Sequence, residues 1–91
     1  GRMNIERITK AKHAIANYIS QIDAMRRAHT EIEVAISHFN AVHEPIPAYT
    51  PAAFNNRRAL RDMADGLEMQ IRVANVRINN LKRVIDEEVN A

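Results

Sequence analysis

Histidines and carboxylates are the side chains of this sequence that could bind a metal ion or transfer protons. The chain has four histidines and 11 aspartates and glutamates. His13 and His38 fall on outward positions of the helical repeat described below, while His29 and His43 lie two heptads apart, about 21 Å along a helix. Neither a Glu-x-x-His nor a His-Glu-x-x-His spacing occurs. We therefore expect no metal site.

Covalent catalysis and cofactor binding have equally little support. The sequence has no cysteine and two glycines, so it offers neither a thiolate nucleophile nor a glycine-rich loop that could bind phosphate. Its few serines and threonines show no setting like that of a catalytic triad. We expect a protein that is not an enzyme and binds no cofactor.

Paired basic residues raise the alternative of nucleic-acid binding. The isoelectric point is about 9.4, and basic residues are adjacent at Arg26–Arg27, Arg57–Arg58 and Lys82–Arg83. The net charge is only +2, however, and the basic residues are spread over most heptad positions, so they form no single stripe. A small dimeric nucleic-acid-binding regulator is therefore the alternative to a protein-interaction module.

The elements that must position these side chains are two long helices. No glycine or proline occurs between Asn4 and His43, and apolar residues recur there at steps of three and four. In heptads abcdefg, the first run has at a and d Ile8, Ala11, Ile15, Tyr18, Ile22, Met25, His29, Ile32, Ile36, Phe39 and His43. The second run has at a and d Ala53, Arg57, Leu60, Ala64, Leu67, Ile71, Ala74, Ile78, Leu81, Ile85 and Glu88. This pattern predicts an all-α fold, a coiled-coil hairpin of antiparallel helices over residues 4–43 and 51–90.

All three prolines lie between the two runs, at Pro45, Pro47 and Pro51. Each lacks an amide proton and disfavours helical geometry at the preceding residue, so the sequence predicts a turn over residues 44–50. Thr50 can cap the second helix, and proline suits the first helical position. We expect Gly1 and Arg2 to be a cloning remnant and the natural chain to start at Met3, so that residues 1–3 are remnant and start. Residues 4–91 are expected to form a single domain. At about 1.5 Å per residue, helices of this length predict a rod about 57 Å long.

The register of the hairpin can also be predicted. If residues whose numbers sum to about 96 face each other, an alanine opposes an isoleucine in three layers, the alternation that lets facing layers interdigitate. These layers are Ala11–Ile85, Ile22–Ala74 and Ile32–Ala64. Opposite charges also meet, with Arg7 and Lys10 near Asp86, Glu87 and Glu88, Asp23 near Arg72, Arg26 and Arg27 near Glu68, and Glu31 and Glu33 near Arg61. Such pairs disfavour slipped and parallel pairings.

Gly66 lies inside the second run. The heptad phase continues through it, so we expect an outward-facing weak point that costs about 1 kcal/mol relative to alanine. The alternative is a kink with Asp65 as a new cap.

Apolar side chains extend beyond the predicted seam. The candidate interaction surface consists of Ile5, Ile19, Met63, Met69, Val73, Val76 and Val84. A hairpin whose apolar positions exceed one narrow stripe normally packs against another element. We expect a homodimer that forms a four-helix bundle; a groove for a partner protein's helix and scattered surface residues are the alternatives.

His29 is the polar interruption of the first seam, and we treat it as a candidate polar switch. It is expected to face Leu67 and to help select the register. Burial would disfavour the protonated imidazole, whereas pairing with Glu33 would favour it, so either sign of a response to acid is open.

The sequence shows no long uncharged apolar run, so we expect no membrane span and no signal peptide. The absence of cysteine is compatible with a reducing compartment, and we expect a cytoplasmic protein. The function that these observations favour is that of a non-enzymatic coiled-coil protein, a structural, adaptor or inhibitory module that self-associates.

Overall fold

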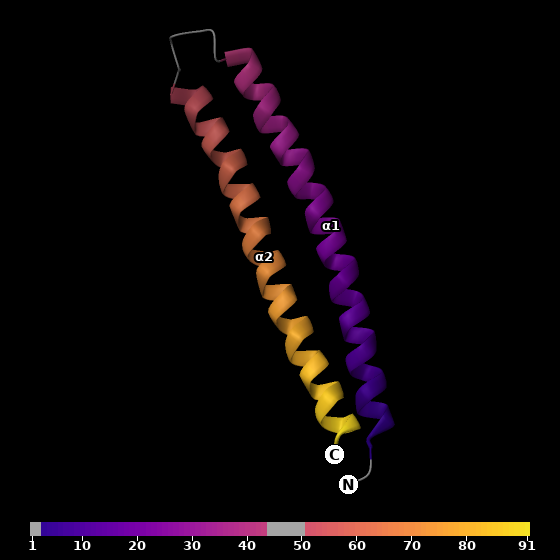
Figure 1. Ribbon diagram of the computed structural model, residues 1–91. Helices are drawn as coiled ribbons and strands as arrows, with labels where there is room; N and C mark the ends of the chain where they lie inside the picture. Colours follow the sequence, from indigo (N-terminus) through magenta and orange to yellow (C-terminus); the bar gives the residue numbers. More distant parts are fainter. Residues whose placement is uncertain (1–2, 44–50) are drawn as a thin grey trace.

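The computed structural model describes residues 3–43 and 51–91, and the surroundings of side chains over 3–40 and 55–91. Two helices make up this part of the chain, α1 (Ile5–His43) and α2 (Pro51–Val89). They pack side by side along their length and run in opposite directions, so the start of α1 and the end of α2 lie at the same end of the molecule (Figure 1). The molecule measures 69 × 16 × 14 Å, which confirms the predicted rod-shaped helical hairpin.

The helix bounds agree with the sequence to within one residue. α1 begins at Ile5 rather than Asn4 because Asn4 is the cap: its side-chain oxygen accepts a hydrogen bond from the backbone N–H of Arg7 at 3.0 Å. Pro51 is the first residue of α2, the position that suits a residue without an amide proton. The predicted turn, with Pro45, Pro47 and Thr50, lies outside the described residues.

The core is a thin seam between the two helices. Its buried apolar side chains are Ile8, Ala11, Ile22, Ile36, Ala64, Ala74 and Ile78. All seven lie at predicted a or d positions, and Ile22 and Ala74 belong to the same packed cluster, as the register requires. The small side chains let the helices approach closely, and the isoleucines fill the space opposite them.

Two charged residues fall on seam positions of the heptad pattern, and the structure places one outside the seam and the other at its margin. Arg57, placed at an a position by the pattern, is exposed, because a guanidinium is more favourably solvated than buried in a thin seam. Glu88, at a d position, is only 14% exposed; its carboxylate accepts a hydrogen bond from Arg7 at 2.7 Å and one from the Asn4 backbone N–H at 3.3 Å. The seam can hold Glu88 because both of its oxygens have partners.

α2 is continuous through Gly66. A β-carbon built on Gly66 would meet no atom within 4 Å, and the residue is exposed. The structure therefore agrees with an outward-facing weak point and not with a kink capped by Asp65.

Candidate interaction surface

The two long edges of the seam differ in chemistry. On one edge, helical phase places the e positions of both helices, which include the charged residues Lys12, Arg26, Glu33, Arg61, Glu68 and Lys82. On the other edge lie the g positions, which are mostly small or uncharged: Ala14, Gln21, Ala28, Ala35, Met63, Gln70 and Val84, with Arg7 and Arg77. We call these the charged edge and the apolar edge.

Large apolar side chains gather on α2 at and next to the apolar edge. We call this set the methionine–valine face: Met63, Met69, Val73, Val76 and Val84. The first four are exposed by 44% to 60%, and Val84 is half-buried beside the seam. Exposed apolar side chains that lie together on one face are candidates for a surface that another protein covers.

The structure does not unite all seven residues of the predicted surface. Ile5 and Ile19 are exposed, but they lie on α1 at e positions, on the charged edge. The candidate surface therefore divides into the methionine–valine face and two isoleucines on the opposite side of the hairpin.

Two shallow hollows flank the centre of the methionine–valine face. One, of about 370 Å³, lies between the helices and is lined by Tyr18 and Met25 of α1 and by Met69, Val73 and Arg77 of α2, among others. The other, of about 490 Å³, lies on α2 itself, and Met69, Val73 and Arg77 line it as well. These three side chains thus form a ridge between two hollows.

Arg77 belongs to this surface although it is charged. Its guanidinium carbon lies 5.9 Å from the centre of the Tyr18 ring, within the range of a cation–π contact. This contact directs the side chain toward α1, so its aliphatic stem extends the apolar surface.

The accessible surface is large for the size of the chain. It is 6811 Å², whereas a compact monomer of 10.4 kDa exposes about 5,400 Å². The excess of about 1,400 Å² per chain follows from the rod shape, in which each helix is covered on one side only.

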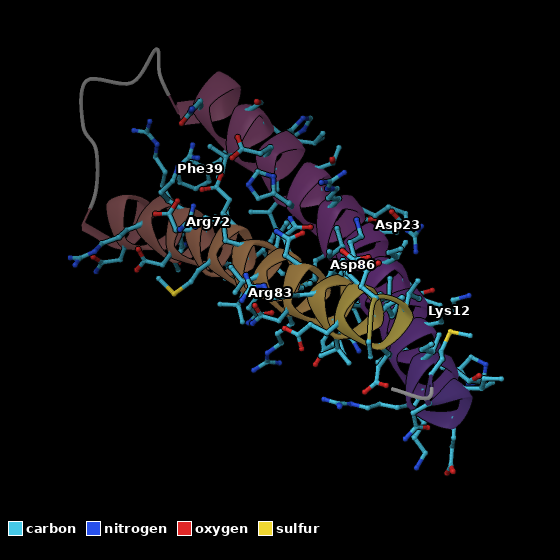
Figure 2. All side chains as sticks on the ribbon, turned by 60° about the horizontal axis from the view of Figure 1, so that its bottom comes forward. Lys12, Asp23, Phe39, Arg72, Arg83 and Asp86 are labelled. Atoms are coloured by element: carbon cyan, nitrogen blue, oxygen red, sulfur yellow. The ribbon has the colours of Figure 1, made fainter. Side chains whose placement is uncertain are left out.

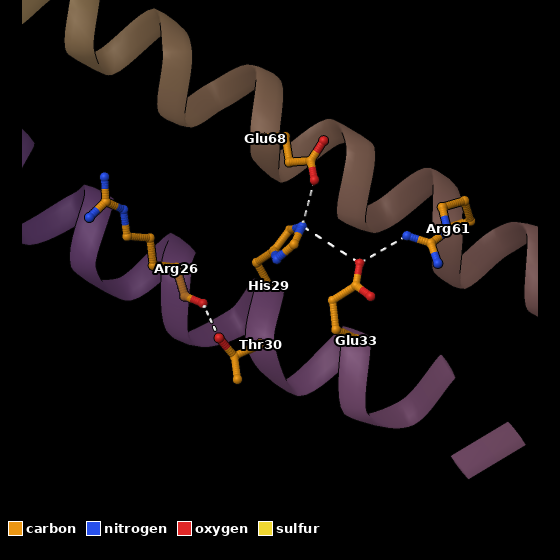
Figure 3. A network of polar contacts seen from close by, with 6 residues as sticks. All are labelled: Arg26, His29, Thr30, Glu33, Arg61 and Glu68. Atoms are coloured by element: carbon orange, nitrogen blue, oxygen red, sulfur yellow. Dashed lines mark hydrogen bonds and ion pairs between the residues drawn. The ribbon is translucent and has the colours of Figure 1, made fainter. Parts of the chain in front are cut away.

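The charged edge holds a polar network around His29 (Figure 3). The Nε2 atom of His29 lies 2.9 Å from Oε1 of Glu68 and 3.9 Å from Oε1 of Glu33. Arg61 donates a hydrogen bond to the same Glu33 oxygen at 2.9 Å. The histidine side chain is 23% exposed, so it lies at the margin of the seam. The role of His29 as a polar switch stays a prediction.

The structure tests several of the predicted charge pairs. Arg7–Glu88 and Arg61–Glu33 form as predicted. Lys10 instead pairs with Glu6 on its own helix, at 3.3 Å. Glu68 contacts His29, at 2.9 Å, rather than the predicted Arg26 or Arg27.

The described residues include neither a candidate metal site nor a membrane-spanning helix. No group of three or more histidine, aspartate or glutamate side chains there is arranged to hold a metal ion. Neither helix, over the same residues, has a segment long and apolar enough to cross a membrane.

Sequence reasoning missed part of this surface. Tyr18 and Met25 were assigned only to the seam, yet they also line the hollow between the helices. Asp62 and Arg83 share heptad position f with Met69 and Val76. Asp62 was not singled out, and Arg83, labelled on α2 in Figure 2, was considered only as part of the basic pair Lys82–Arg83. Reading the residues along position f would have found them.

In comparisons with protein-family models, curated proteins and solved structures, nothing matched this chain.

Proposed function

We propose that this protein is a non-enzymatic interaction module that self-associates as a homodimeric four-helix bundle. The exposed methionine–valine face is the observation that supports this function most strongly. It lies beside the apolar edge, where α1 presents alanines, so a second hairpin can approach both helices. The role of such a bundle would be structural, adaptor or inhibitory.

The size of the unburied surface supports a second copy as the partner. A rod of two helices leaves one side of each helix exposed along its length, so the area for an interface is available, and the same apolar face is present on every copy. The charged edge, with its network of His29, Glu33, Glu68 and Arg61, would remain in water.

Light scattering at micromolar concentration tests this function. We expect a mass about twice the 10.4 kDa of the chain, and a monomer for Val73→Glu, which places a charge on the methionine–valine face. Asn75→Glu, on the charged edge, is the matched control and should remain a dimer. A monomeric parent protein would rule out the proposed function.

The nucleic-acid-binding alternative is tested in the same apparatus. Adding a structured RNA or a DNA duplex should leave the scattering mass of the dimer unchanged at physiological salt. A salt-dependent complex with either would favour a nucleic-acid-binding regulator instead.

A further inference from the structure

The methionine–valine face repeats its own pattern when α2 is read in the reverse direction. Over residues 60–85, the f positions of α2 are Asp62, Met69, Val76 and Arg83: the two inner residues are apolar, the two outer ones are charged, and their midpoint lies next to Val73. The g positions of the same segment are Met63, Gln70, Arg77 and Val84: the two outer residues are apolar, the two inner ones are polar, and their midpoint lies on the other side of Val73. Between these rows, Val73 occupies a c position at the centre. A surface of this kind can pair with itself across a twofold axis.

We infer that α2 packs against α2 of a second copy in antiparallel orientation, with the twofold axis passing next to Val73. This inference rests on the proposed self-association and specifies its geometry. In this arrangement, Val73 meets Val73 of the partner subunit, and Met69 meets the partner subunit's Val76. Met63 meets the partner subunit's Val84, so large apolar side chains oppose each other in these layers, while Gln70 meets the partner subunit's Arg77.

Charge complementarity fixes the orientation. Asp62 and Arg83 lie about 15–17 Å on either side of Val73, at helical spacing of about 1.5 Å per residue. The antiparallel arrangement places Asp62 against the partner subunit's Arg83, and by symmetry this ion pair forms twice. A parallel arrangement would oppose Asp62 to itself and Arg83 to itself. Like charges in such positions disfavour that orientation.

The two hollows supply the space that this packing needs. The ridge of Met69, Val73 and Arg77 lies between a hollow of about 370 Å³ and one of about 490 Å³. A second copy turned by 180° about an axis next to Val73 presents the same ridge and hollows, so the two ridges can lie side by side, each against a hollow of the other copy. The hollow between the helices lies toward α1, so both α1 helices come to the same side of the α2 pair.

Cysteine cross-linking tests the position of the twofold axis, because the natural sequence has no cysteine. Val73→Cys should form a disulfide-linked dimer on mild oxidation at low protein concentration, since the two sulfur atoms lie beside the axis. Asn75→Cys, on the charged edge of the same helix, is the control and should remain uncross-linked. Equal cross-linking of both variants, or none of Val73→Cys, would overturn the inference.

A charge exchange tests the orientation. Asp62→Arg or Arg83→Asp alone should raise the dimer dissociation constant by about tenfold or more, because two ion pairs become two repulsive pairs. The double variant Asp62→Arg/Arg83→Asp should restore the parent affinity to within about threefold. A double variant as weak as the single ones would overturn the antiparallel orientation.

Light scattering on the same samples separates the two proposals. A dimer that fails both the cross-linking and the charge-exchange tests contradicts this geometry and leaves the proposed function intact. A monomeric parent protein contradicts both.

Discussion

The guanidinium of Arg7 lies 2.7 Å from the carboxylate of Glu88, which joins the first turn of α1 to the last turn of α2. The same carboxylate accepts a hydrogen bond from the backbone N–H of Asn4, the capping residue of α1. Glu88 thus stabilises the start of α1 and also fixes the register of the two helices at that end of the hairpin.

Glu88→Gln should therefore destabilise the hairpin. The Glu88 side chain is mostly buried but Arg7 is 56% exposed, so we expect a loss of about 0.5–1 kcal/mol in the free energy of unfolding. Urea unfolding at a fixed protein concentration measures it. Lys10→Gln, which removes the fully solvated pair with Glu6, should cost less, and an equal loss for both variants would contradict a special role for Glu88.

Gly66→Ala should stabilise α2. A new methyl group would meet no atom within 4 Å, so the gain comes from helix propensity alone, about 1 kcal/mol. The converse change Ala16→Gly, at an exposed position of α1, should lose a similar amount. Thermal melting of the two variants checks this, and a destabilised Gly66→Ala would show that the glycine has a conformational role.

Ala64→Leu should destabilise the seam, because Ala64 is completely buried and the facing helix leaves no room for a larger side chain. We expect a cost of about 1–3 kcal/mol from overpacking. Ala16→Leu, on an exposed position of α1, is the matched control and should change stability by less than about 0.5 kcal/mol. Equal stability of Ala64→Leu and the control would indicate that the helices do not pack in this register.

His29→Leu should stabilise the hairpin at neutral pH by about 1 kcal/mol, since an apolar side chain replaces a partly buried polar one in the seam. Glu68 and Glu33 are 48% and 40% exposed and can be solvated once the histidine is gone. His29→Ala controls for loss of the ring alone. A less stable His29→Leu would mean that the contact with Glu68 outweighs apolar packing.

The heptad pattern was sufficient to predict both helices, their antiparallel pairing and nearly the whole seam, because a two-helix hairpin has one interface and a strict apolar period defines it. Arg57 shows the limit of the pattern: it falls on a seam position of the repeat, but its side chain is exposed. The partner of Glu68 was missed because charge pairing was judged by register alone. Choosing between His29 and the two arginines requires the direction of each side chain.

The candidate surface was predicted less completely. Its residues were recognised as excess apolar area, but Ile5 and Ile19 were grouped with residues of the opposite edge because the pattern was not followed around both helices. The hollows beside Val73 depend on how side chains from two helices meet, which a single helical repeat does not specify.

Sedimentation equilibrium of the unmodified protein across the micromolar range tests the central claim most directly. The claim is that the methionine–valine face is covered by a second copy of the chain. We predict a single species with about twice the 10.4 kDa mass of the chain, dissociating only at the lowest concentrations. A well-folded monomer over the whole range would contradict it.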